Sequence, residues 1–239
     1  MSDTLRDRVV LITGATGSLG TTVARTFAET GARLALTSRS AGGLEQLVAA
    51  LRVPAERTMT VAGDATQPDQ VERLIGAVEA RLGGIDVLLN TVGGWRGGKR
   101  VGETPLEEWE HMMALNLHSA FHFSRQVLPR MLETGWGRIV HVSSKTAVHP
   151  RAKQVGYAVS KLALIALTET IALEVKGTGV TANVILPSTI DTPDNREMMP
   201  KADPSQWVET GQIAAMMRFL CSEAGAAING ARIPMYGDA

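Results

Sequence analysis

Short runs rich in β-branched residues alternate along this chain with longer stretches in which apolar residues recur every three to four positions. This alternation is typical of repeated strand and helix units built around a parallel sheet. The short runs predict seven strands, at residues 9–13, 33–37, 58–61, 85–90, 138–142, 180–186 and 232–235. The periodic stretches predict helices at residues 19–30, 43–51, 67–82, 106–133, 156–176 and 209–222. The pattern therefore predicts a doubly wound α/β fold with helices on both faces of the sheet.

Length and composition favour one domain. A chain of 239 residues has the size of α/β domains that are routinely single, and it can bury enough apolar surface to fold without disulfides or a structural metal. We find no internal repeat or linker in the sequence. We therefore expect residues 1–239 to form one domain, in which residues 188–210, with several Pro, Met and polar residues, form a lid over the site.

Charge and cysteine content exclude several function classes. The 24 Lys and Arg are balanced by 24 Asp and Glu, so the chain lacks the basic excess that nucleic-acid binding requires. A single Cys cannot form an internal disulfide, which fits a reducing cytosol. The longest apolar stretch, residues 162–173, is shorter than the ~20 residues of a membrane span. We expect a cytoplasmic protein that has a small-molecule substrate and neither a nucleic-acid nor a membrane partner.

A glycine-rich string follows the first predicted strand directly and opens the first predicted helix. Its glycines are Gly14, Gly17 and Gly20. Small residues let the backbone turn sharply and approach a pyrophosphate, and the helix N-terminus offers it unpaired N–H groups and a positive dipole. Because strand, spacing and helix agree, we predict that this turn binds a dinucleotide.

The end of the second predicted strand bears on which dinucleotide is bound. An acidic residue there would accept hydrogen bonds from a ribose 2′-OH, but this chain has Ser38 and Arg39. An arginine suits a 2′-phosphate, so NADP(H) is favoured and NAD(H) is the alternative. Asp64, after the third predicted strand, could accept from the adenine amine or cap the next helix.

Tyr157 and Lys161 lie four residues apart at the start of an apolar helix, so both project from one face. An unassisted phenol titrates near pH ~10, which makes it a poor acid or base at neutrality. An ammonium about 4 Å away contributes roughly 4 kcal/mol at an effective dielectric of ~20, enough to lower the phenol pKa by about three units. The pair is therefore predicted to transfer a proton to a carbonyl or from an alcohol.

Ser144 lies at the end of the fifth predicted strand, thirteen residues before Tyr157. Ligands in open α/β sheets bind outside the carboxyl ends of the strands, and three other strand ends carry Gly14, Asn90 and Pro187. All these residues are therefore predicted to point into one crevice.

The sequence resembles the short-chain dehydrogenase/reductase family over essentially its whole length. The resemblance is carried by four features in the same order as in that family: the glycine motif, an Asn in the fourth predicted helix, a Ser, and Tyr-x-x-x-Lys. The resemblance implies a Rossmann-type sheet of seven strands in the order 3-2-1-4-5-6-7. It implies that Tyr157 is the general acid/base, that Lys161 lowers the Tyr157 pKa and holds the nicotinamide ribose, and that Ser144, preferred to Ser143 for its spacing, orients the substrate oxygen. Asn116 matches the family residue that holds a water in a proton relay to the Lys.

The resemblance also extends the cofactor site and implies a homo-oligomer. The expected oligomer is a tetramer, with a dimer as the alternative, formed through the helices at 106–133 and 156–176. The expected cofactor-binding residues are Gly14, Thr16, Gly17, Ser18, Leu19, Gly20, Ser38, Arg39, Asp64, Ala65, Asn90, Val92, Gly93, Tyr157, Lys161, Pro187, Ile190 and Thr192.

The chain departs from the family pattern at three places. Ser18 replaces a glycine of the first motif, residues 90–93 read Asn-Thr-Val-Gly where Asn-Asn-Ala-Gly is usual, and Ser188 follows Pro187 where a glycine is usual. These departures affect phosphate and adenine packing more than the reaction. The segments 92–98 and 186–207 resemble quinonoid dihydropteridine reductases, although those enzymes lack the Ser that stands here at 144. Pterin reduction is therefore the alternative activity, and a non-catalytic NAD(P)-binding sensor or scaffold is the alternative of another class.

Substrate contacts are the least constrained part of the sequence. The expected candidates are Trp95, His149, Met198 and Trp207, because they lie near the catalytic motifs or in the expected lid. His118 and His122 have the spacing of two metal ligands, but no carboxylate or Cys completes a site, and no metal is expected.

Overall fold

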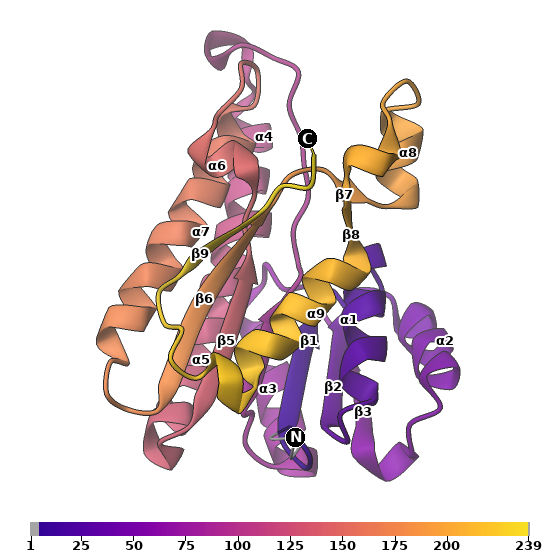
Figure 1. The fold of residues 1–239 in the computed structure, drawn as a ribbon, viewed down its shortest axis with the longest axis vertical. Helices are drawn as coiled ribbons and strands as arrows, with labels where there is room; N and C mark the ends of the chain where they lie inside the picture. Colours follow the sequence, from indigo (N-terminus) through magenta and orange to yellow (C-terminus); the bar gives the residue numbers. More distant parts are fainter. Residues whose placement is uncertain (1–4, 239) are drawn as a thin grey trace.

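The chain folds around a parallel seven-stranded sheet in the order β3-β2-β1-β4-β5-β6-β9. The computed structural model describes residues 5–238 (Figure 1). The strands are β1 (Val9–Thr13), β2 (Arg33–Ser38), β3 (Thr58–Ala62), β4 (Val87–Asn90), β5 (Gly137–Val142), β6 (Val180–Pro187) and β9 (Arg232–Met235). The predicted strand order is confirmed, with β9 as the seventh strand.

Helices cover both faces of this sheet. Within β1, Val10 and Ile12 enter one apolar cluster while Val9 and Leu11 enter the other, as expected for a strand that is buried on both sides. The first cluster is covered by α1 (Ser18–Ala28), α2 (Ala41–Leu51) and α9 (Thr210–Cys221). The second is covered by α3 (Pro68–Leu82), α5 (Ser119–Thr134) and α7 (Val155–Glu174).

The predicted helix at 106–133 is not one continuous α-helix. It consists of α4 (Leu106–Met113), a π-helical turn η3 (Ala114–His118) and α5. Apolar periodicity alone does not reveal a π turn, which adds one residue without breaking the helix. The predicted strand at 85–90 begins later, at Val87, and the other predicted boundaries agree to within about a turn.

The expected lid has secondary structure of its own. Two-residue strands β7 (Ile190–Asp191) and β8 (Val208–Glu209) pair in parallel, and α8 (Pro193–Met198) lies between them. Figure 1 shows α8 at the edge of the molecule, across from α4 and α6 (Lys145–Val148). Strands this short have no sequence periodicity, so the sequence predicted only a loop. The remaining short turns are η1 (Ala55–Arg57), η2 (Val101–Glu103), η4 (Pro204–Gln206) and η5 (Glu223–Gly225).

By length and hydropathy alone, α7 could cross a membrane. In the fold it packs against β6, α4 and α6, and its buried side chains include Leu164, Ile165 and Ile171. The packing in the core accounts for its apolar composition.

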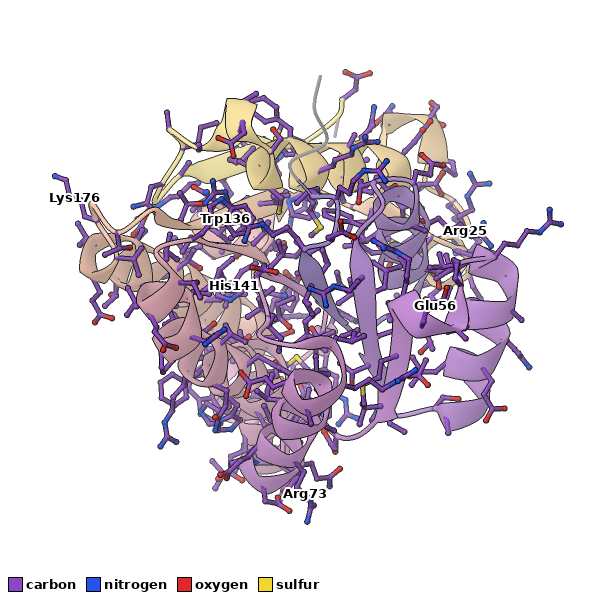
Figure 2. All side chains as sticks on the ribbon, turned by 90° about the horizontal axis from the view of Figure 1, so that it is seen from below. Arg25, Glu56, Arg73, Trp136, His141 and Lys176 are labelled. Atoms are coloured by element: carbon purple, nitrogen blue, oxygen red, sulfur yellow. The ribbon has the colours of Figure 1, made fainter. Side chains whose placement is uncertain are left out.

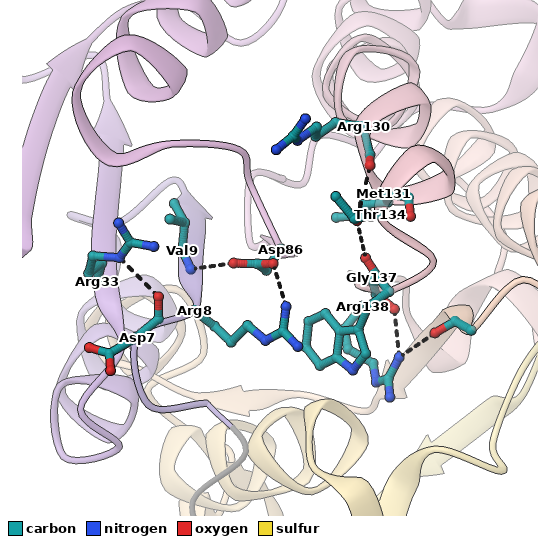
Figure 3. Close-up of polar contacts among 12 residues, drawn as sticks. Asp7, Arg8, Val9, Arg33, Asp86, Arg130, Met131, Thr134, Gly137 and Arg138 are labelled. Atoms are coloured by element: carbon teal, nitrogen blue, oxygen red, sulfur yellow. Dashed lines mark hydrogen bonds and ion pairs between the residues drawn. The ribbon is translucent and has the colours of Figure 1, made fainter.

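Charged side chains hold the edge of the sheet at which the parallel strands begin. Asp86 pairs with Arg8 at 2.9 Å and accepts from the Val9 backbone N–H at 2.8 Å (Figure 3). The guanidinium groups of Arg8 and Arg138 lie 3.9 and 4.4 Å from the ring centroid of Trp136. These contacts tie β1, β4 and β5 together at their starting ends.

Candidate active site

The parallel register brings the chemically interesting strand ends to one edge of the sheet. Thr13 at the end of β1 lies beside Asn90 at the end of β4, and Val142 at the end of β5 lies beside Ile185 in β6. The turn after β1, Ser143 and Ser144 after β5, and the lid after β6 therefore lie along the same edge of the sheet. That this edge forms a ligand-binding crevice stays a prediction.

The glycine turn after β1 leaves the start of α1 open. Gly14 has a φ of +66°, a backbone conformation that favours glycine. A side-chain Cβ at this position would also lie only 3.1 Å from the Val92 backbone N. A Cβ on Gly20 would lie 2.2 Å from the Gly14 carbonyl O, so this close approach requires glycine. Gly17 is the N-cap and gives α1 no side-chain cap. Thr16 and Ser18 are partly accessible beside it, whereas Leu19 is buried in the core.

Asn90 holds an unused donor beside this turn. Its Oδ1 accepts from Thr13 Oγ1 at 2.6 Å, while its buried Nδ2 has no partner among residues 5–238. Thr91 Oγ1 donates to the Thr13 carbonyl at 2.6 Å. An uncapped helix N-terminus, a glycine cradle and an orphan amide donor together fit a phosphate-bearing dinucleotide.

The end of β2 exposes a cation and no carboxylate. Ser38 Oγ accepts from Ser40 N at 3.1 Å, and Ser40 Oγ caps α2 by accepting from Gly43 N at 3.0 Å. Arg39, between the two serines, is exposed and makes no hydrogen bond or ion pair with the part of the chain that the structure describes. Burial lowers the pKa of nearby His111, and the positive charges of Arg96 and Arg39 lower it further.

Asp64 neither caps α3 nor stands free. Its Oδ1 accepts from Thr66 N at 2.9 Å and from Thr66 Oγ1 at 2.8 Å, which closes a turn ahead of the helix, while the N-cap of α3 is Gln67. The capping alternative for Asp64 is therefore wrong, because the helix starts later. The adenine contact of Asp64 and Ala65 stays a prediction.

Asn116 lies in the π-helical turn and binds the loop that follows β4. Its Oδ1 accepts from Gly94 N at 3.0 Å, and its Nδ2 donates to Gly94 O at 3.1 Å and to Ser160 Oγ at 3.1 Å. The side chain is fully buried. Asn116 thus links three segments of the site, α4–α5, the loop and α7.

Lys161 is buried and directed at the same loop. Its Nζ donates to the Val142 carbonyl at 2.8 Å, and a Cβ on Gly93 would lie 2.9 Å from Nζ. Burial lowers the pKa of Lys161 to about 8. Ser143 Oγ donates to the Lys161 carbonyl at 2.7 Å, so Ser143 anchors α7.

Ser144, which follows β5, and Tyr157 in α7 are in hydrogen-bond contact. Ser144 Oγ caps α6 by accepting from Thr146 N at 3.1 Å. Burial raises the pKa of Tyr157, and a hydrogen bond with Ser144 opposes that shift. The prediction that the Tyr157 pKa is lowered does not hold in this structure, because burial raises it and only the hydrogen bond with Ser144 acts in the opposite direction.

A buried histidine behind the site was missed by sequence reasoning. His141 in β5, labelled in Figure 2, is fully buried. Its Nδ1 lies 2.9 Å from Thr168 Oγ1, and its Nε2 lies 3.1 Å from Ser124 Oγ. Thr168 Oγ1 donates to the Leu164 carbonyl, so it accepts from Nδ1–H and Ser124 donates to Nε2. Burial and the Lys161 charge lower the His141 pKa to about 3. The neutral imidazole fixes β5 against α5 and α7.

The expected nicotinamide side of the site lies where β6 enters the lid. Pro187 is buried, Ile190 is half-buried in β7, and Thr192 Oγ1 caps α8 by accepting from Asn195 N at 3.2 Å. Their contact with the cofactor stays a prediction.

The four expected substrate residues differ in their surroundings. Trp95 is 46% exposed and Met198 is 58% exposed. His149 is also exposed, and its ring packs edge-on against the Tyr236 ring, with 6.3 Å between the ring centroids. Trp207 is only 8% exposed and packs where the lid rejoins the core, so the expectation that it faces the substrate is not supported. Gln154, whose buried Oε1 has no partner within the described residues, was missed because a glutamine carries no motif.

Comparisons with known proteins agree with this geometry. A family model described as short chain dehydrogenase matches residues 8–203. D-threitol dehydrogenase of Mycolicibacterium smegmatis is 33% identical over 98% of this chain and 93% of its own. D-beta-hydroxybutyrate dehydrogenase of Rhizobium meliloti is 29% identical over 96% of this chain and 97% of its own.

A solved structure extends the likeness to three dimensions. L-sorbose reductase of Gluconobacter frateurii, complexed with NADPH and L-sorbose, superposes with a TM-score of 0.91 at 27% identity and covers 99% of this chain and 98% of its own. The matched family model, the similar relatives and the shared fold show that this chain belongs to the short-chain dehydrogenase/reductase family of oxidoreductases.

Proposed function

We propose that this protein is an NADP(H)-dependent oxidoreductase that interconverts a carbonyl and a secondary alcohol, with Tyr157 as the general acid/base. The observation that carries the proposal is the meeting of Ser144, Tyr157 and Lys161 at the sheet edge that also holds the uncapped start of α1. A protein that only bound the dinucleotide would have no need for these proton-transfer groups.

The chain's own residues would bind the cofactor and supply the proton, whereas bound NADP(H) supplies the hydride. The Gly14 turn and Asn90 Nδ2 would hold its phosphate end, and Lys161 its nicotinamide ribose. With its pKa raised, the Tyr157 phenol is protonated at neutral pH and can donate to a carbonyl oxygen during reduction. Ser144, which is in hydrogen-bond contact with Tyr157, would orient that oxygen.

Arg39 supports NADP(H) over NAD(H). It is exposed at the end of β2, where a carboxylate would repel a 2′-phosphate and a guanidinium can bind it. L-sorbose reductase, which shares the fold, is complexed with NADPH.

The direct test is a panel of ketones, each assayed with NADPH and with NADH. We expect ketone-dependent oxidation of NADPH, and slower oxidation of NADH at equal concentration. Oxidation of neither cofactor by any ketone, together with tight cofactor binding, would instead favour the sensor or scaffold alternative.

A further inference from the structure

A polar cavity of about 470 Å³ lies at the edge of the sheet at which the parallel strands begin. We call it the base cavity. Its charged lining consists of four arginines and two aspartates, namely Arg6, Arg8, Arg33, Arg130, Asp7 and Asp86. The whole chain has equal numbers of basic and acidic residues, so this excess of cations is local.

The base cavity is separate from the candidate active site. Arg8 directly precedes β1, and Gly14 directly follows it. At about 3.3 Å per residue, the strand places these two residues roughly 20 Å apart. A cofactor bound at the glycine turn would therefore leave the base cavity open.

Both aspartates of the base cavity are already engaged. Asp86 pairs with Arg8 at 2.9 Å and accepts from the Val9 backbone N–H at 2.8 Å. Asp7 Oδ1 pairs at 2.9 Å with Arg57, which does not line the cavity. The two aspartates therefore do not neutralise the other three arginines.

Arg33 brings a positive charge that no described carboxylate balances. Its Nε donates to the Asp7 carbonyl at 2.9 Å, and its Nη1 donates to the Leu82 carbonyl at 2.6 Å. Its Nη2 has no hydrogen-bond partner within residues 5–238. Two neutral acceptors thus fix the guanidinium in place and leave it N–H donors for an anion.

Arg6 and Arg130 reach the base cavity from two other elements. Arg6 is exposed in the turn before β1 and makes no hydrogen bond or ion pair with the described residues. The Arg130 guanidinium, near the end of α5, pairs at 3.0 Å with Glu133, and both side chains are about half exposed or more. An exposed pair of this kind contributes little, so an anion can compete for Arg130.

Gly84 leaves the space in which the Arg130 side chain lies. A Cβ on Gly84 would lie 2.6 Å from Arg130 Nε and 2.9 Å from its Cγ. Gly84 is not among the glycines with positive φ, so its backbone does not itself require glycine. In Figure 3, Arg130 points from α5 toward the loop between α3 and β4, which contains Gly84. Gly84→Ala should therefore displace Arg130 without changing any charge.

We propose that the base cavity is an anion site that binds the phosphate groups of a phosphorylated small molecule. Its arginines come from the turn before β1, the start of β2 and the end of α5. Donors from several directions suit a tetrahedral phosphate, whereas one guanidinium fork already matches a planar carboxylate. A volume of about 470 Å³ is typical of small-molecule sites. The proposal is independent of the proposed function.

The test is calorimetric titration with pyrophosphate. The glycine turn is also expected to bind pyrophosphate, so we expect two equivalents on wild type and one on the double variant Arg6→Met, Arg130→Met. Each single variant should weaken the base-cavity equivalent at least fivefold, which keeps the test valid if the double variant does not fold. Arg73→Met is the matched control, because Arg73 is an exposed arginine on α3 that is paired with Asp69 (Figure 2). It should bind as wild type does.

Gly17→Ala and Gly84→Ala separate the two sites. Gly17→Ala should lose only the equivalent at the glycine turn. Gly84→Ala should weaken only the equivalent at the base cavity, at least fivefold. If the proposed function fails, the wild type should bind one equivalent and the double variant none, so the two failures are distinguishable.

Three results would overturn the proposal. The first is pyrophosphate binding by the double variant that equals wild-type binding. The second is wild-type binding by Gly84→Ala, because positive charge alone would then attract the anion. The third concerns malonate, a dicarboxylate, which we expect to bind Gly17→Ala at least tenfold more weakly than pyrophosphate does. Equal or tighter malonate binding would contradict the phosphate class.

Discussion

At the scale of single residues, Lys161 carries a cost of burial that depends on pH. Its pKa is about 8 in the folded chain and 10.5 when unperturbed. Between these values the unfolded chain holds a proton that the folded chain has released, so stability rises with pH, by up to about 1.4 kcal/mol per unit. Below pH 8 both states are protonated and the penalty is constant.

We therefore predict that the unfolding free energy of the wild type, relative to Lys161→Met, increases by about 1 kcal/mol from roughly pH 8.5 to 9.5. Urea unfolding of both proteins at each pH measures this difference, because the other titrations are shared. A difference that stays constant with pH would mean that the buried ammonium keeps its ordinary pKa.

Tyr157 can be tested against an internal control, because the chain has only one other tyrosine, Tyr236. Tyr157→Phe removes the proton donor and keeps the ring, so we expect turnover to fall by about three orders of magnitude or more while NADPH binding changes little. Tyr236→Phe should keep most of the activity. Steady-state rates and fluorescence titration of NADPH test both. A Tyr157→Phe enzyme with wild-type rates would refute the catalytic role.

Arg39 is the residue on which we predict the cofactor preference to depend. We expect wild type to bind NADPH at least tenfold more tightly than NADH, a difference of about 1.4 kcal/mol, and Arg39→Ala to lose that difference by weakening NADPH alone. Arg25, a cation at the end of α1 that points outward in Figure 2, supplies the matched control Arg25→Ala. If NADH binds as tightly to the wild type, Arg39 is a solvated surface residue.

Some properties of single residues could be predicted from the sequence, and others could not. That Tyr157, Lys161 and Ser144 lie near the end of β5 followed from their spacing and from the strand ends. The direction of the Tyr157 pKa shift did not, because it depends on how deeply the phenol is buried and on its hydrogen bond with Ser144. The His141 network is likewise invisible in sequence, since its partners come from helices far apart in the chain.

At the scale of elements, we expect two glycines near the start of α1 to differ in role: Gly20 is needed for folding, and Gly17 for cofactor binding. A Cβ on Gly20 would collide with the Gly14 carbonyl at 2.2 Å, whereas on Gly17 it would meet that oxygen at an ordinary 3.4 Å. We predict that Gly20→Ala destabilises the protein by about 2 kcal/mol or more. Gly17→Ala should unfold near the wild-type midpoint yet bind NADPH more weakly. Denaturant unfolding and cofactor titration of both variants measure this; equal loss of stability would contradict it.

Elements were predictable where one physical signal dominates. Strands that are buried on both faces appear as unbroken apolar runs, such as 9–13, and were located closely. The π-helical turn at Ala114–His118 and the paired strands β7 and β8 were not, because each depends on contacts between distant segments.

At the scale of the whole molecule, the outer surfaces of α5 and α7 present exposed apolar side chains. Phe121 on α5 is 45% exposed, and Leu162 and Leu173 on α7 are 47% and 76% exposed. Both helices cover the same face of the sheet, so these residues can contribute to one interface. Large exposed apolar residues on adjoining helices are typical of protein–protein contacts.

We predict a homotetramer that uses this surface, with a mass in solution near four times 25.5 kDa. Leu162→Glu combined with Phe121→Glu should give a smaller species, because two charges would be buried in each contact. Light scattering after size exclusion measures the masses, and Phe219→Glu, at an exposed position on α9 over the opposite face of the sheet, is the control for surface charge alone. Dissociation by Phe219→Glu instead would move the interface to α9, and a monomeric wild type would show that the α5 and α7 surface serves another purpose.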